Sequence, residues 1–106
     1  MPTERIALTE AVYYILLSLD KPMHGYGIMQ NVAELSGGRV NLAAGTLYGA
    51  LDTMGKKGWI KELPEEKNSR KKQYEITASG KEMLVNEISR LRELITNGEQ
   101  IMRGDK

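Results

Sequence analysis

Residues 41–60 read NLAAGTLYGALDTMGKKGWI, and they predict a helix with two unlike sides. Leu47, Leu51 and Met54 recur at spacings of four and three residues, which is the period of a helix that buries one apolar face. The other side of that helix would carry only small or hydroxylated residues, namely Gly45, Thr46, Tyr48 and Gly49. Burial in the hydrophobic core does not explain why this side carries such residues.

The flanks of this stretch set the limits of the helix. We expect it to begin near Ala43 or Ala44. It should end around Lys57, because Gly58 is a favourable C-cap.

The chain before this helix predicts two more helices. Residues 11–19 are apolar nearly all round, which indicates a buried first helix with Thr9 as its N-cap. Residues 21–27, KPMHGYG, supply turn chemistry. A short amphipathic helix follows and stops at Gly37 and Gly38; its apolar residues are Ile28, Val32 and Leu35.

After the third helix the period changes to two, which is that of strands. The segments WIKEL at residues 59–63 and KQYEIT at residues 72–77 both alternate, with Tyr74 and Ile76 on one face. The polar segment PEEKNSRKK between them favours a long exposed loop. We therefore predict a β-hairpin.

The remaining sequence predicts one long helix that Thr77 can cap. Its apolar residues have a period close to the value of about 3.5 that forms the seam of a coiled coil. They are Leu84, Ile88, Leu91, Ile95 and Met102. Gly98 takes the missing position of the seam, so we expect the helix to fray or bend there and to end in a loose tail.

Three helices followed by a hairpin are the elements of a winged helix-turn-helix, in which the third helix enters a DNA major groove and the hairpin, or wing, lies on the neighbouring backbone. We predict a mainly α fold with a small β-hairpin and a C-terminal dimerisation helix. Residues 1–76 would form the DNA-binding domain, and residues 77–106 the dimerisation helix and tail, within one compact unit.

The bare side of the third helix fits this fold. Gly45 and Gly49 would let the helix approach DNA closely, and Thr46 and Tyr48 supply hydroxyls for phosphate oxygens. The alternative is that the two glycines only allow tight packing within the domain.

Basic residues gather around the hairpin and would bind phosphates without specifying a sequence. They are Lys56, Lys57, Lys61, Lys67, Arg70, Lys71 and Lys72. Glu62, Glu65 and Glu66 leave the alternative that the loop is an ordinary solvated turn.

Four motifs in register resemble the PadR-like family of dimeric winged helix-turn-helix transcriptional regulators. They are HGYG at residues 24–27, GTLYGAL at 45–51, GWI at 58–60 and RKKQYEITASGK at 70–81. The resemblance covers residues 8–94 and is to the short branch of the family, which dimerises through one C-terminal helix. It implies binding to double-stranded DNA, repression of a nearby gene and release by a small ligand.

Carried over position by position, the resemblance places Tyr26 near the DNA backbone and makes Tyr74 and Ile76 the anchors of the wing. Together with the residue patterns it gives the predicted DNA-binding set. This set is Tyr26, Ala44, Gly45, Thr46, Tyr48, Gly49, Lys56, Lys67, Arg70, Lys71 and Lys72.

The seam of the final helix could cover its own domain or meet a partner. It is longer than a domain this small needs for one flank, so we expect it to pair with a second copy of the chain. Val85 and Leu94 add apolar surface beside it. A two-fold dimer would place two third helices roughly 34 to 36 Å apart and require a near-palindromic operator.

A candidate effector pocket for a small apolar or planar ligand comprises Leu8, Val12, Tyr13 and Ile15, although plain packing is the alternative for the tyrosines. Multidrug-sensing members of the short branch carry a tryptophan on the final helix. Here the sole tryptophan is Trp59, which we expect to pack where the wing joins the body, so drug binding of that kind is not expected. Two other functions stay open: a protein-interaction module without DNA binding, and a DNA-binding regulator without an effector.

The composition limits which other classes of protein the chain could belong to. The chain has 106 residues and a formal net charge of +1, with 41% apolar and 27% charged residues, which is ordinary for one small soluble domain. It has no cysteine and one histidine, His24, to which we assign a structural role, and its carboxylates do not converge on a site. We therefore expect no enzyme, no metal site and no cofactor. Without a long apolar run or a secretory signal, we expect a cytoplasmic protein that does not enter a membrane.

Overall fold

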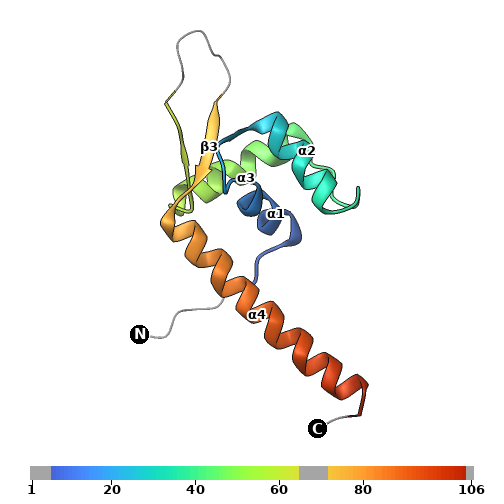
Figure 1. Ribbon diagram of the computed structural model, residues 1–106. Helices are drawn as coiled ribbons and strands as arrows, with labels where there is room; N and C mark the ends of the chain where they lie inside the picture. Colours follow the sequence, from blue (N-terminus) through green and yellow to red (C-terminus); the bar gives the residue numbers. More distant parts are fainter. Residues whose placement is uncertain (1–5, 65–71, 105–106) are drawn as a thin grey trace.

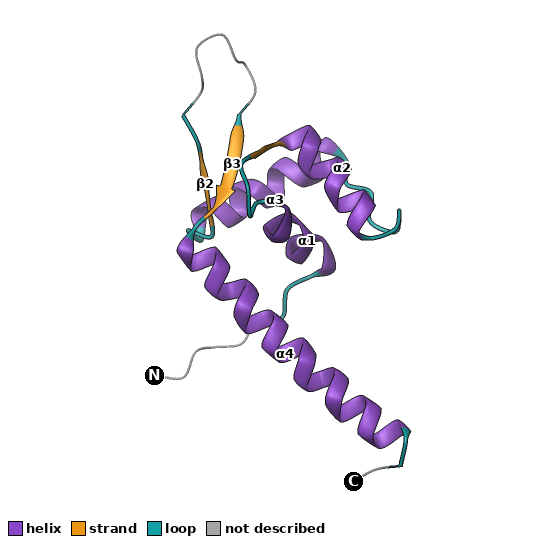
Figure 2. Ribbon diagram, in the orientation of Figure 1, coloured by secondary structure: helices purple, strands orange, loops and turns teal. Residues whose placement is uncertain are grey.

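The structure, a computed structural model, describes residues 6–64 and 72–104. Within these residues the helices are α1 (Glu10–Ser18), α2 (Gly25–Leu35), α3 (Ala44–Lys56) and α4 (Ala78–Met102). The strands are β1 (Met23–His24), β2 (Ile60–Glu62) and β3 (Gln73–Ile76). The predicted fold, mainly α with a small β-hairpin, is confirmed, and Figures 1 and 2 show α4 continuing away from the other helices.

The predicted helix ends are set by local hydrogen bonds. The Thr9 hydroxyl accepts the N–H of Val12 at 3.1 Å, and the Thr77 hydroxyl accepts the N–H of Gly80 at 3.1 Å. These bonds satisfy donors that the first turn of a helix leaves free. Gly58, just after α3, has a φ of 79°, a value that glycine adopts without strain.

The sheet contains one strand more than the predicted hairpin. Its order is β1-β3-β2, and both pairings are antiparallel, with Ile60 opposite Ile76 and Met23 opposite Tyr74. The prediction of a plain turn over residues 21–27 was therefore wrong for β1. The backbone of β3 has a second edge, and β1 satisfies hydrogen-bonding groups there that would otherwise lack protein partners.

The core lies where α1, α2 and α3 meet the sheet. Leu47, Leu51 and Met54 form the buried face of α3, as the sequence predicts. Tyr74 and Ile76 are also buried, so the wing formed by β2 and β3 is anchored in the core. The sheet and the core together fix how the wing stands beside α3 (Figure 2).

Trp59 lies at the junction of α3, the wing and α4. Its side chain belongs to the core, which confirms the predicted packing role. Its carbonyl oxygen accepts the N–H of Thr77 at 2.9 Å. Gly80 comes so close that a Cβ there would lie 2.1 Å from the same oxygen, so the start of α4 is docked on the body by backbone contact.

The rest of α4 leaves the body. Leu84, predicted for the dimer interface, belongs to the core of its own chain with 8% of its surface exposed, so it offers little surface to a partner. The helix continues unbroken through Gly98, where a fray or bend was predicted, and ends at Met102. In Figure 1 the wing and the end of α4 lie at opposite ends of the molecule.

A buried carboxylate ties α4 to the segment before α1. Glu87 accepts the backbone N–H of Leu8 at 3.0 Å and pairs with Arg90 through contacts of 2.6 and 2.8 Å. The hydrogen bonds from Arg90 are the largest cause that lowers the pKa of Glu87, with a further contribution from the Leu8 N–H, while burial opposes them. Glu87 therefore stays ionised at neutral pH.

Candidate nucleic-acid interface

The outer side of α3 is bare. Gly45 and Gly49 are exposed, and a Cβ added at either position would meet no atom of the described residues within 4 Å. The alternative that these glycines allow tight packing within the domain is therefore wrong for the described part of the chain. The space in front of them is open to a second molecule.

The hydroxylated residues of α3 border this open side. Thr46 and Tyr48 are exposed, as is Ala44 at the start of the helix, and Tyr48 exposes 48% of its surface. The Tyr48 hydroxyl reaches α2, where a Cβ at Gly25 would lie 2.3 Å from its oxygen. Gly25 thus leaves the room that Tyr48 occupies.

Tyr26 follows Gly25 in the first turn of α2 and is 66% exposed. Its hydroxyl accepts a hydrogen bond from Gln30 at 3.3 Å. The structure therefore brings the two predicted tyrosines, Tyr26 and Tyr48, to the amino-terminal end of α2. The free N–H groups and the dipole at a helix N-terminus favour an anion such as a phosphate.

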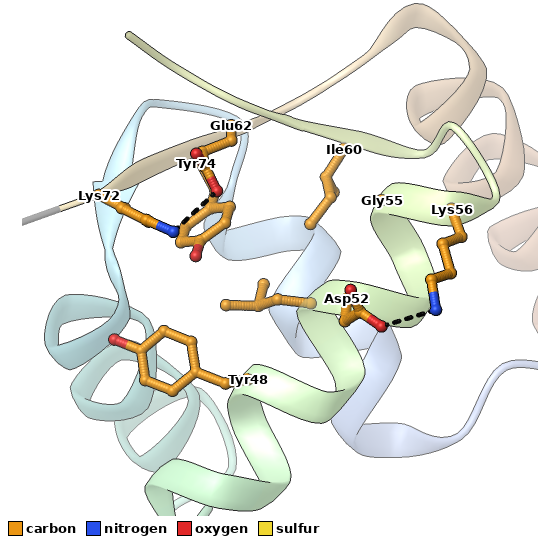
Figure 3. A pocket seen from close by; sticks show the side chains of 9 residues that line it. Tyr48, Asp52, Gly55, Lys56, Ile60, Glu62, Lys72 and Tyr74 are labelled. Atoms are coloured by element: carbon orange, nitrogen blue, oxygen red, sulfur yellow. Dashed lines mark ion pairs between the residues drawn. The ribbon is translucent and has the colours of Figure 1, made fainter. Parts of the chain in front are cut away.

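A groove of about 380 Å³ separates α3 from the wing (Figure 3). We call it the α3–wing groove. Its polar lining residues are Tyr48, Asp52 and Lys56 of α3 with Glu62, Lys72 and Tyr74 of the wing. Figure 3 shows these side chains coming from both walls, so the predicted basic residues Lys56 and Lys72 do face a common space.

Both lysines of the groove are held by carboxylates. Lys56 lies 3.1 Å from Asp52, and Lys72 lies 3.7 Å from Glu62. All four side chains are more than half exposed, so these ion pairs are weak and a phosphate can exchange with the carboxylates. Sequence reasoning did not identify Asp52 as a residue of the site, although its spacing of four from Lys56 was visible.

Tyr74 lies at the floor of this groove with 9% of its surface exposed. Burial raises the pKa of its hydroxyl, and the nearby Glu62 carboxylate raises it further. The hydroxyl therefore keeps its proton at neutral pH and adds no negative charge to the groove.

Not every predicted basic residue can be placed. Lys67, Arg70 and Lys71 lie outside the described residues. Lys61 lies 3.8 Å from Glu75 on the wing and does not line the groove.

The predicted effector residues do not form one pocket. Leu8 and Val12 line a second cavity, of about 330 Å³, which we call the N-terminal cavity. Ile15 is fully buried in the core, and Tyr13, whose ring centroid lies 5.9 Å from that of Tyr14, is not among the cavity residues. Ile15 lies one turn further along α1 than Val12, at a level where the core of the domain covers it completely.

Half of the residues that line the N-terminal cavity come from a distant part of the chain. They are Ala50, Thr53 and Met54 of α3, with Lys57 and Trp59 beyond it. This contribution from the end of α3 was not predicted, because periodicity within one helix does not report which other helix lies beside it.

The described residues offer neither a cluster of metal ligands nor a membrane-spanning helix. The described residues contain no group of three or more histidine, cysteine, aspartate or glutamate residues that could hold a metal ion. His24 precedes α2 but makes no side-chain capping bond, and its buried Nδ1 has no partner among the described residues. Among residues 6–64 and 72–104, no helix is long and apolar enough to cross a membrane.

Comparison with known proteins agrees with this geometry. The chain is similar to the crystal structure of a PadR family transcription regulator from Clostridium difficile, with 28% identity, a TM-score of 0.74, and coverage of 89% of this chain and 99% of that one. A PadR family transcriptional regulator from Eggerthella lenta has the same fold, with 21% identity, a TM-score of 0.73, and coverage of 86% and 80%.

One curated relative is much longer than this chain. It is an uncharacterized 37.1 kDa protein in a transposon of Streptomyces fradiae, 35% identical over 79 residues. The matched region covers 74% of this chain but 22% of that protein. A sequence model described as the transcriptional regulator PadR-like family matches residues 14–86, a span that contains α2, α3 and the wing. The chain therefore belongs to the PadR-like family of transcriptional regulators.

Proposed function

We propose that the protein is a sequence-specific DNA-binding repressor that acts as a homodimer in the cytoplasm on a near-palindromic operator. The observation that carries this proposal is the open side of α3, where Gly45 and Gly49 meet no other atom of the described chain within 4 Å. A helix without side chains on one side can lie deep in a major groove, so that its neighbouring side chains reach base edges and phosphates.

The contacts divide into two kinds. Thr46 and Tyr48 project from α3 beside the open side and are the candidates for contacts to bases or to the adjacent phosphates. Asp52, an acceptor that a phosphate would repel, could contact only a base donor such as the amino group of cytosine. Tyr26, at the start of α2, and Lys72, on the wing, would bind the DNA phosphate backbone on either side of the major groove. A lysine contact to phosphate supplies affinity through counterion release, and it weakens as the salt concentration rises.

The homodimer is supported by the exposed apolar residues of α4. Ile88, Leu94, Ile95, Ile101 and Met102 expose between 36% and 85% of their surface. They lie on the part of α4 that leaves the body (Figure 1). A second copy of the same helix would cover this apolar surface and place two α3 helices on successive turns of DNA.

Two substitutions test DNA recognition. We expect Tyr48→Ala to weaken operator binding by about tenfold or more with the fold retained, because its side chain is half exposed. Lys72→Ala should weaken binding to operator and random duplex to a similar degree and reduce the salt slope by about one. Fluorescence anisotropy at several salt concentrations measures both, and unchanged binding in either variant removes that residue from the interface.

A third substitution tests the homodimer. Ile95→Glu places a charge on an exposed apolar position of α4 and should produce a folded monomer, because a buried unpaired carboxylate opposes association. Analytical ultracentrifugation measures the oligomeric state of the variant and of the unmodified protein. A monomeric unmodified protein, or a variant that stays dimeric, would contradict pairing through α4.

Repression and release are the remaining parts of the proposal. A dimer on an operator excludes other proteins from that DNA, and a ligand that binds better to a conformation with lower DNA affinity releases it. Transcription from a promoter that carries the operator, measured in vitro with and without the protein, tests repression. Increased transcription on addition of the protein would overturn it.

A further inference from the structure

The N-terminal cavity has the size and the lining of a small-molecule site. Its volume of about 330 Å³ lies within the range of about 300 to 1,000 Å³ that ligand pockets occupy. Leu8, Val12, Ala50 and Met54 give it aliphatic walls, and these walls come from the segment before α1, from α1 and from α3. The apolar body of a ligand would therefore contact parts of the chain that are distant in sequence.

The lining of the cavity includes one cationic side chain, that of Lys57. The ammonium group of Lys57 lies 5.2 Å from the centroid of the Trp59 ring, and both residues line the cavity. Lys56, Lys61 and Lys72 each have a carboxylate within ion-pair distance, whereas no such partner occurs for Lys57 among the described residues. The charge that complements this cavity is negative.

The cavity is separate from the α3–wing groove. Lys56 lines the groove and Lys57 lines the cavity, as expected for successive residues that point about 100° apart at the end of a helix. The two spaces thus lie on different flanks of the same recognition helix, and a ligand in the cavity would not compete directly for the groove.

The contact made by the Trp59 ring indicates whether a flat or a flexible ligand fits the cavity. The Lys57 ammonium lies over this ring, so the ring surface is engaged in a cation–π contact and is less available for stacking with a flat ligand. The remaining lining is mostly aliphatic, with Thr9 and Thr53 as its two hydroxylated residues. Such a lining suits a flexible alkyl chain better than an aromatic plate.

We propose that the N-terminal cavity binds a medium-chain fatty carboxylate, with the alkyl chain among Val12, Ala50 and Met54 and the carboxylate paired with Lys57. Contacts of the cavity with α3 and with Leu8 would make this ligand the effector that releases DNA. This role rests on the proposed function. Ala50 and Met54 belong to α3, so the occupied cavity touches the recognition helix directly. The helix that we assign to the dimer is reached through Leu8, which lines the cavity and whose N–H is bonded to Glu87 of α4.

Trp59 is the sole tryptophan, so its fluorescence reports on the cavity directly, and aliphatic ligands do not absorb at its wavelengths. Hexanoate, octanoate and decanoate are titrated into the full chain without DNA. We expect a saturable change and a gain in affinity of about fourfold for each added methylene group. The absence of a saturable change with all three carboxylates would overturn the proposal whether or not the protein binds DNA.

The role of Lys57 is tested with octanoate and its neutral counterpart octanol. Lys57→Gln should lower the affinity for octanoate relative to octanol by about fivefold, since the lysine is exposed and its pairing is screened. Lys56→Gln, one residue away on the other flank, is the matched control and should leave this ratio unchanged. An equal ratio in the unmodified protein and in Lys57→Gln would overturn the assignment of the carboxylate.

A cavity-filling variant tests the place of the alkyl chain. Ala50→Met should abolish binding of both octanoate and octanol, provided that circular dichroism shows the native helix content, while retained binding would overturn the assignment of this cavity. Operator affinity is then measured with saturating octanoate. A weaker complex is the expected result, and an unchanged one would overturn the effector role.

Discussion

The backbone of Gly25 and the hydroxyl of Tyr48 lie so close that a Cβ at residue 25 would be 2.3 Å from the Tyr48 oxygen and 2.8 Å from its ring carbon Cζ. The contact joins the first turn of α2 to the middle of α3. Gly25 does not have a positive φ, so its lack of a side chain serves this close approach rather than the conformation of the backbone.

Gly25→Ala should displace the Tyr48 ring, because the end of a side chain can move more easily than the helix backbone. We expect the fold to persist at a cost of about 1–3 kcal/mol from overpacking, and operator binding to fall with the loss of the Tyr48 position. Chemical denaturation and fluorescence anisotropy measure the two effects. Adding Tyr48→Ala should restore the stability but not the binding, and a double variant that stays as unstable as Gly25→Ala would disprove the contact.

Gly45→Ala and Gly49→Ala should separate stability from function. Neither new methyl group meets an atom of the described chain within 4 Å, so each should stabilise α3 by about 0.5–1 kcal/mol. Both should weaken operator binding by about tenfold if the helix approaches DNA closely. Thermal unfolding and anisotropy provide the two readings, with Ser89→Ala, at an exposed position of α4 outside the predicted seam, as a control that leaves DNA affinity unchanged.

Asp52→Asn should increase the affinity for random duplex DNA. The carboxylate lies 3.1 Å from the Lys56 ammonium, so its neutralisation frees one cation for a phosphate. The slope of log K against log salt should become steeper by about 0.9. Glu99→Gln changes the same charge near the far end of α4 and should have little effect, and an Asp52→Asn slope equal to that of the unmodified protein would show that Lys56 does not reach DNA.

Glu87 should give the protein a component of acid sensitivity. Its pKa is lowered in the folded state by Arg90 and by the Leu8 N–H, so its contribution to stability is present above the unfolded pKa of about 4.3 and is lost as the pH falls through the lower folded value. Glu87→Gln should cost about 1–3 kcal/mol at pH 7 and flatten the fall in stability below about pH 5.

Urea denaturation at equal protein concentration and several pH values tests this prediction. Glu82→Gln, an exposed position on the same helix, is the control and should follow the unmodified protein throughout. If Glu87→Gln kept the full acid sensitivity, that sensitivity would belong to other carboxylates.

Much of the fold could be predicted from local sequence patterns. Thr9 and Thr77 predicted helix starts because capping depends on residues within one turn, and the buried row of α3 followed from its spacing alone. Strand β1 could not be predicted, because a strand of two residues shows no period and its partner β3 lies far along the chain.

The site was predictable as a set of residues but not as a set of contacts. The exposure of Gly45, Thr46 and Tyr48 agrees with the sequence interpretation, since one helix determines it. The contact of Gly25 with Tyr48 depends on how two helices meet. The same limitation explains Leu84, which has the period of the seam but is covered by the core, and Ile15, which was assigned to a pocket that it does not reach.

Selection of genomic DNA fragments by the purified protein, at about 150 mM salt with excess random duplex, tests DNA recognition most directly. We expect a few retained fragments that share an inverted repeat, with half-sites about one helical turn apart, and we expect Tyr48→Ala to retain none of them. If the unmodified protein retains no fragment and also fails to bind random duplex at low salt, the assignment of α3 and the wing to DNA is wrong.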